Sequence, residues 1–188
     1  ELIVESQTAI GASLGEDAIL QGRNAVAIGL LAVFLFMFAY YKGAGFNALV
    51  AQVLNLYLML SILSAFNLTL TLPAIAGFVL TIGMAVDANV IIFERIKEEF
   101  LLGKGRRAAV DAGFDKAFWA VMDGNITTII AALFLAQLGT GPIQGFAVSL
   151  AIGNISSLFT SLFVSRLIFD FGTEALNRQK ISISWRIK

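Results

Sequence analysis

The sequence predicts an all-α membrane protein, a bundle of five transmembrane helices preceded by a short extracytoplasmic strand and helix. Composition and run length both predict this class. Of the 188 residues, 58% are hydrophobic and 14% are charged, whereas soluble domains average about 45–50% apolar and about 25% charged residues. The apolar residues form runs of about 20, enough to cross a bilayer as a helix. These runs are too long, and alternate too little, for the strands of a membrane β-barrel.

The sequence contains no Cys and no His, and its formal net charge is zero. A disulfide scaffold, a zinc finger, an imidazole metal site and a Cys or His nucleophile are therefore excluded. The zero net charge gives no electrostatic indication of nucleic-acid binding. We accordingly expect a membrane protein that is not an enzyme and that has no metal or other cofactor.

Five apolar runs define the expected spans, at residues 24–41, 46–66, 73–93, 118–138 and 145–169. They make up a transmembrane domain over residues 23–170, and a cytoplasmic tail follows over residues 171–188. The charged segment 94–117 predicts a cytoplasmic helical hairpin that is broken at Gly103 and Gly105.

Residues 1–22 are typical of the end of an extracytoplasmic domain and its connecting helix. Leu2–Val4 predicts a short strand, and Ser13 with Glu16 three residues later fits a capping box at a helix start. A frayed terminus is the alternative. The segment has no basic stretch of the kind that begins a signal peptide, so we do not expect one.

Charge is sorted between two sets of segments that flank the spans. One set, at residues 1–22, 67–72 and 139–144, contains four acidic residues and no Lys or Arg. The other set, at residues 42–45, 94–117 and 170–188, contains eleven Lys and Arg residues. Because basic residues concentrate on the cytoplasmic side, we expect an extracytoplasmic N-terminus and a cytoplasmic C-terminus.

Small residues recur every four positions along the fifth expected span, at Gly145, Ser149, Gly153, Ser157, Ser161 and Ser165. Such a ladder lets two helix backbones approach closely in a membrane. Looser versions occur in the third span, at Ala76, Leu80, Gly83 and Asp87, and in the fourth, at Asn125, Thr128, Ala132 and Ala136. We expect these three spans to form a tight inner cluster and the first two spans to face lipid.

Asp87 is the residue that simple bundle packing does not explain. It lies 14 residues past Pro73 and seven before Glu94, about 10 Å inside the cytoplasmic end of its span. An Asp at this depth costs about 2.5–3.5 kcal/mol on insertion scales, and such residues mark ion or proton paths. Removal from water favours the neutral carboxyl group, so we expect a buried proton-coupling residue. An Asp that only joins helices, through an Arg or an amide, is the alternative.

Other polar residues of the third and fourth expected spans could support Asp87. Asn89, Asn125, Thr127 and Thr128 can form hydrogen bonds but cannot carry a proton, so they are candidate supporting residues. Asp123 lies near the edge of the fourth span, where a capping or interfacial role competes with a relay role.

Arg166 is expected to extend to the cytoplasmic headgroups. Its candidate ion-pair partners are Asp170 and Asp123.

Two aspartates in spans also raise the alternative of an intramembrane aspartyl protease, in which two carboxylates share a proton. The Gly-x-Gly-Asp pattern typical of that class is absent, because Asp87 follows Gly83-Met84-Ala85-Val86. The protease interpretation is therefore disfavoured.

Several stretches of the chain resemble the SecD proteins of the SecD/SecF family. They are 73–77, 83–90, 93–99, 123–128 and 139–147, with sequences PAIAG, GMAVDANV, FERIKEE, DGNITT and GTGPIQGFA. The resemblance covers essentially the whole chain in one register. One departure is Gly124, where the family has Ala.

This resemblance implies a subunit of bacterial protein export within the resistance-nodulation-division superfamily of proton-driven transporters. The chain would then be transmembrane spans two to six, half of that type of membrane domain, in the bacterial inner membrane. The implied partners are SecF, the SecYEG channel and preproteins, with YajC and YidC as further candidates. The implied activity is to use the proton-motive force, after the ATP-driven SecA step, with Asp87 carrying the proton and Asp123, Asn125, Thr127 and Thr128 shaping its path.

Two alternatives stay open at this stage. A half-transporter of the same superfamily would move a lipid or small molecule and would need a substrate cavity in the membrane. A passive scaffold would only hold the export subunits together, and Asp87→Asn would then have no effect. Sodium could replace the proton in either active role.

Overall fold

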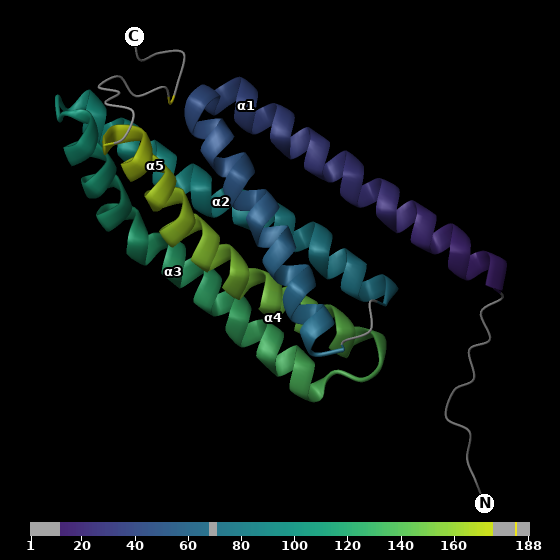
Figure 1. The fold of residues 1–188 in the computed structure, drawn as a ribbon. Coiled ribbons are helices and arrows are strands. Elements are labelled where there is room, and N and C mark those ends of the chain that lie inside the picture. Colours follow the sequence, from purple (N-terminus) through teal and green to yellow (C-terminus); the bar gives the residue numbers. More distant parts are fainter. Residues whose placement is uncertain (1–11, 68–70, 175–182, 184–188) are drawn as a thin grey trace, which may run out of the picture.

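The computed structural model describes residues 12–67, 71–174 and 183, and within them it is an antiparallel bundle of long helices (Figure 1). The elements are α1 (Ala12–Ala65), α2 (Leu72–Leu101), α3 (Arg106–Leu138), α4 (Pro142–Phe159), the π-helical turn η1 (Thr160–Val164) and α5 (Ser165–Glu174). The expected strand at Leu2–Val4 lies outside the described residues. Helix α1 begins one residue before Ser13, and the side chains of Ser13 and Glu16 are not described, so the capping box stays a prediction.

The first helix contains two of the expected spans. It runs for 54 residues, but Lys42 has non-helical angles of φ 50° and ψ −116°, and the chain folds back on itself there (Figure 1). A Cβ atom on Gly45 would collide with the backbone carbonyl of Met37, so the tight turn requires glycine at position 45. We call residues 12–41 the first arm and residues 43–65 the second arm.

Four helical stretches of the described residues are long and apolar enough to cross a membrane, with the two arms of α1 counted as one. Each arm is about 30 Å or more in length at 1.5 Å per residue. The expected five-span topology therefore depends on whether the turn at Lys42 lies at a membrane surface, and it stays a prediction. The other helices extend past their apolar runs into the charged segments.

The charged segment 94–117 forms the expected helical hairpin. Helix α2 ends at Leu101, α3 begins at Arg106, and Gly103 adopts a left-handed φ of 89° between them. Lys104 and Lys116 both bridge the carboxylate of Glu99, at 2.5 and 2.6 Å, and these hydrogen bonds lower the pKa of Glu99. The hairpin and the turn at Lys42 lie at the same end of the bundle, here called the basic end.

The small-residue ladder is buried from Ser149 to Ser165. Ser149, Ser157 and Ser165 have no exposed surface, and Ser149 donates a hydrogen bond to the carbonyl of Ala74 at 3.2 Å. A spacing of four residues drifts by about 40° per step around an α-helix. The wider turn of η1 offsets this drift between Ser157 and Ser165, which keeps the ladder on one side.

Helices α2, α3 and α4 do form the inner cluster, but the expected packing face of α2 is wrong. The face that meets the ladder contains Ala74, Gly77 and Thr81, which are buried. The residues Ala76, Leu80, Gly83 and Asp87 are exposed, and a Cβ atom on Gly83 would meet no atom within 4 Å. Two faces of α2 present small residues, and only the three-dimensional packing distinguishes them.

The expectation for the first two spans is half wrong. The first arm is mostly exposed, as a lipid-facing helix would be. The second arm packs into the bundle and buries Asn47, Gln52 and Asn55, and Asn47 donates a hydrogen bond to the carbonyl of Ser165 at 2.9 Å. The side chain of Asn47 therefore joins the second arm to the beginning of α5.

Aromatic residues fill the core at the basic end. Phe93 packs edge to face against both Tyr41 and Phe169, with ring centroids 5.5 Å apart in each of the two pairs. Phe114 contacts Phe169 from α3 at 6.2 Å. This end joins four helical elements through large side chains, whereas α2 and α4 meet along most of their length through small ones.

Candidate functional site

Asp87 lies at the middle of α2, 15 residues after Leu72 in a helix that ends at Leu101. It is exposed, outside the face of α2 that packs against the ladder of α4. The expectation that the helices of this chain bury Asp87 is therefore wrong. No hydrogen bond or ion pair joins Asp87 to any residue in the described part of the chain.

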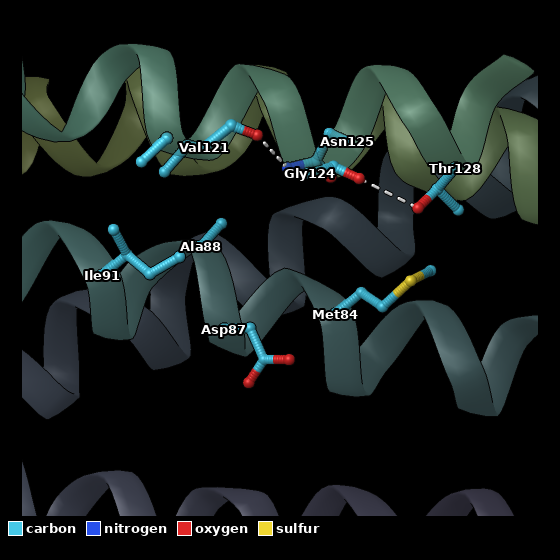
Figure 2. Close-up of a pocket in the computed structure, with 9 residues that line it drawn as sticks. Met84, Asp87, Ala88, Ile91, Val121, Gly124, Asn125 and Thr128 are labelled. Carbon is cyan, nitrogen blue, oxygen red and sulfur yellow. Dashed lines mark hydrogen bonds between the residues drawn. The ribbon is translucent and has the colours of Figure 1, made fainter.

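A pocket of about 150 Å³ lies beside Asp87, between α2 and α3. Helix α2 contributes Met84, Asp87, Ala88 and Ile91, and helix α3 contributes Ala120, Val121, Gly124, Asn125 and Thr128. Figure 2 shows the Asp87 carboxylate at the edge of this pocket, turned away from Asn125 and Thr128. The floor is therefore largely apolar, and the charge sits at its open rim.

The polar residues of α3 bond to their own helix and not to Asp87. The side chain of Asn125 donates to the Val121 carbonyl at 2.7 Å, and Thr128 donates to the Gly124 carbonyl at 3.0 Å (Figure 2). Thr127 likewise donates to the Gly124 carbonyl at 3.0 Å. Each hydroxyl keeps free lone pairs, since the donated proton uses none of them.

The predicted supporting residues divide into two groups. Asn125 and Thr128 line the pocket with Asp87, so the structure brings these three together. Asn89, Asp123 and Thr127 do not line it. Asn89 is buried on the other side of α2, where it donates to the Ala85 carbonyl at 3.2 Å, while Asp123 and Thr127 are exposed on α3.

Asn154 is a residue near the site that sequence reasoning missed. It is fully buried on α4 and donates to the backbone carbonyl of Asn125 at 3.0 Å. This bond fixes α3 to α4 at the turn that carries Asn125 and Gly124. The sequence signal was an amide one residue after the ladder position Gly153, in the middle of an expected membrane span.

Gly113 is a second missed residue, where α3 crosses α2 near the basic end. A Cβ atom there would lie 2.7 Å from the backbone nitrogen and Cα of Ile96. Only glycine allows the two backbones to approach this closely. The position lies in the charged segment, where no small-residue ladder marks it.

Arg166 pairs with carboxylates that the sequence did not suggest. Its guanidinium lies 3.2 Å from Asp111 and 3.8 Å from Asp115, and over the Phe114 ring at 5.8 Å. The proposed pairing with Asp123 is wrong, because Asp123 lies about two turns or more farther along α3 from these residues. Arg166 thus joins α5 to the beginning of α3, where the helical hairpin enters the bundle.

Comparison with known proteins places this geometry in a family. Residues 1–174 match the model described as protein export membrane protein SecD/SecF, C-terminal. The protein translocase subunit SecD of Treponema pallidum is 64% identical over 186 residues, which are 99% of this chain and 32% of that protein. The SecD subunit of Rhodothermus marinus is 56% identical over 90% of this chain and 27% of that protein. The chain thus spans about a third of the length of such relatives.

Solved structures agree in fold. The crystal structure of SecDF from Thermus thermophilus, described as a translocon-associated membrane protein, superposes with a TM-score of 0.87 and 46% identity over 91% of this chain and 24% of that one. A second SecDF crystal structure, in a super-membrane-facing form, gives 0.84 and 44% identity over 95% of this chain and 24% of that one. The family model, the curated relatives and the superposed folds agree over nearly the whole chain. The chain therefore belongs to the SecD/SecF family of protein-export membrane proteins.

Proposed function

We propose that this chain is the ion-coupling membrane part of a SecD-type subunit, which uses the proton-motive force to complete preprotein translocation after the SecA step. The observation that carries the proposal is Asp87, a carboxylate at mid-helix on an open face with no partner in the described residues. The relatives are named protein translocase subunits, which supports the export role.

An ionised Asp87 facing lipid costs about 2.5–3.5 kcal/mol at mid-helix. The cost falls when the group binds a proton, and it also falls when a polar partner covers it. A face whose stability depends on protonation can therefore exist in two arrangements, and ion flow can drive the exchange between them. Asn125, Thr128 and the adjacent pocket offer room for water or a proton donor beside the carboxylate.

We further propose that SecF covers the Asp87 face in the assembled protein. Small residues on that face, Gly83 on α2 and Gly124 on α3, leave open space where another helix can approach. The sorting of basic residues supports an extracytoplasmic N-terminus and a cytoplasmic C-terminus in the inner membrane. Motion of α2 would then pass along the first arm of α1 to the extracytoplasmic side.

The test is Asp87→Asn in the full-length protein, with Asp123→Asn as the matched control. Membrane vesicles that export a preprotein are energised by SecA and ATP, with and without an imposed proton gradient. Because Asn cannot carry a proton, we expect Asp87→Asn to remove the gradient-dependent part of translocation and Asp87→Glu to retain some of it. Asp123→Asn, outside the pocket, should lose much less.

Unchanged gradient-dependent translocation in Asp87→Asn would contradict the proton role and favour a passive scaffold. If a sodium gradient stimulated translocation in place of the proton gradient, Asp87 would still be the ion-coupling residue, and the coupled ion would be sodium. A half-transporter that moves a small molecule past Asp87 is less well supported, because the pocket beside this residue, about 150 Å³, is smaller than the ~300–1,000 Å³ of ordinary ligand sites.

A further inference from the structure

A second, larger groove lies between the two arms of α1 and the beginning of α2, away from Asp87. It has a volume of about 540 Å³. The first arm contributes Arg23 and Leu30, the second arm Leu56 and Leu60, and α2 Ile75 and Phe78. Apart from Arg23, every residue that lines the groove is apolar.

The first arm stands away from the rest of the bundle at its N-terminal end (Figure 1). Gly22 contacts α2 near this end, since a Cβ atom there would lie 3.2 Å from the Ile75 side chain. The groove follows directly beside this contact, because Ile75 also lines it. The groove is therefore bounded by α2 and by the two arms of α1, which the turn at Lys42 joins.

Arg23 lies far from the other basic residues of the bundle. Of the nine Lys and Arg residues that the structure describes, seven lie in the segments at the basic end, Arg166 is close to that end, and Arg23 alone lies at the other. It immediately precedes the apolar run 24–41, at the level where a membrane surface is expected. Among the described residues, no carboxylate pairs with it.

We infer that the groove binds an anionic phospholipid, with one acyl chain between the arms and α2 and the phosphate at Arg23. A guanidinium binds phosphate oxygens through paired hydrogen bonds. A headgroup with net negative charge avoids placing a second cation beside Arg23, and each basic side chain near a membrane surface favours anionic lipid by about 1 kcal/mol, or about fivefold.

A polypeptide occupant fits the groove less well. A peptide segment in the membrane must satisfy its backbone N–H and C=O groups, and the lining offers no polar side chain except Arg23. A helical segment would satisfy them itself, but it would bring no phosphate to Arg23, the one charged residue of the lining. An acyl chain has no polar groups along its length and matches both the apolar walls and the single cation.

The inference can be tested by lipid photocrosslinking in the full-length protein. A benzophenone side chain replaces Leu60 in the groove or Leu133 on α3, which are 54% and 55% exposed. Vesicles of equal parts phosphatidylcholine and phosphatidylglycerol contain a trace of one radiolabelled lipid or the other. At Leu60 we expect about fivefold more crosslinking to phosphatidylglycerol than to phosphatidylcholine, and at Leu133 nearly equal amounts.

Arg23→Gln should reduce the preference for phosphatidylglycerol at position 60 to the level found at position 133. Arg23→Lys should retain most of this preference. Ala27→Phe, which fills the groove without changing charge, should reduce crosslinking of both lipids at Leu60 only. Crosslinking at Leu133 confirms that each variant is inserted and folded. Equal crosslinking of the two lipids at Leu60, or a preference that survives Arg23→Gln, would overturn the inference and leave only ordinary lipid contact.

Discussion

Two faces of α2 both contain small residues, but they differ in burial and in charge. On one face Ala74, Gly77 and Thr81 are buried against the ladder of α4. On the other, Gly83 and Asp87 are exposed. Small residues occur on both, so residue size alone does not show which face is packed within the chain. What distinguishes the faces is the carboxylate, which a face in lipid cannot hold at low cost.

The comparison suggests that the two faces of α2 have different roles. The ladder face holds α2 and α4 together, and we propose that the Asp87 face makes the contacts that change with ion binding. Substitutions on the two faces should therefore have different consequences, in fold on one side and in assembly or coupling on the other.

Gly77→Leu should have the largest effect on the fold. A Cβ atom at position 77 would already collide with the side chain of Ser149 and lie 3.1 Å from the Phe146 carbonyl. Overpacking of this kind costs about 1–3 kcal/mol or more. We expect a lower unfolding midpoint, measured by heating or by denaturant in detergent micelles.

Gly83→Leu, six residues along the same helix, is the matched control. Its side chain would enter open space, so we expect the unfolding midpoint of this chain to change little. If SecF covers the face, the same variant should reduce recovery of SecF with the full-length protein. Equal destabilisation by both substitutions would remove the distinction between the faces.

Asn154→Leu should have an intermediate effect. The variant removes the hydrogen bond to the Asn125 carbonyl, and such interhelical bonds contribute about 0.6 kcal/mol on average and at most about 1.7. Unfolding of the purified protein measures this loss. Thr127→Val is the control, because the Thr127 hydroxyl bonds only within α3, and a drop as large as that of Asn154→Leu would speak against the interhelical role.

The smallest effect is expected at the basic end, from Glu99. Hydrogen bonds from Lys104 and Lys116 lower its pKa in the folded protein. Its contribution is therefore fully present above the pKa of an unfolded Glu, and is lost as the pH falls through the lower folded-state pKa. Unfolding measured as a function of pH should show this loss.

Glu99→Gln should remove that part of the pH dependence. Glu98→Gln should leave the pH dependence unchanged, because Glu98 forms an exposed ion pair with Arg95, three residues before it on the same helix. A pH profile that is the same in wild type and Glu99→Gln would show that the two lysine contacts do not stabilise the hairpin.

The sequence predicted the helical class, the hairpin at Gly103 and the tight cluster of the last three spans. Composition and run length determine these features, because a membrane leaves few alternatives. The ladder was recognisable because a small residue, such as Ser149 or Gly153, recurs at every fourth position. By contrast, Gly113 and Asn154 act as single contacts between distant helices, and a single residue leaves no periodic signal.

The site was predicted in part. Asp87 was identifiable because a carboxylate inside an apolar run is costly, and Asn125 and Thr128 line the same pocket. Its exposure could not be predicted, because helix rotation is set by packing against α3 and α4. The partners of Arg166 were also missed, since Asp111 and Asp115 meet it only after the hairpin folds back.

The most direct test of the central claim is what covers the Asp87 face in the full-length protein assembled in membranes. A benzophenone side chain at Ile91, which lines the pocket and is 37% exposed, is compared with one at Val50 on the second arm, 38% exposed. Mass spectrometry then identifies each adduct. We predict that Ile91 reacts mainly with SecF polypeptide and Val50 to a much smaller extent. Reaction of Ile91 with lipid alone would contradict the account.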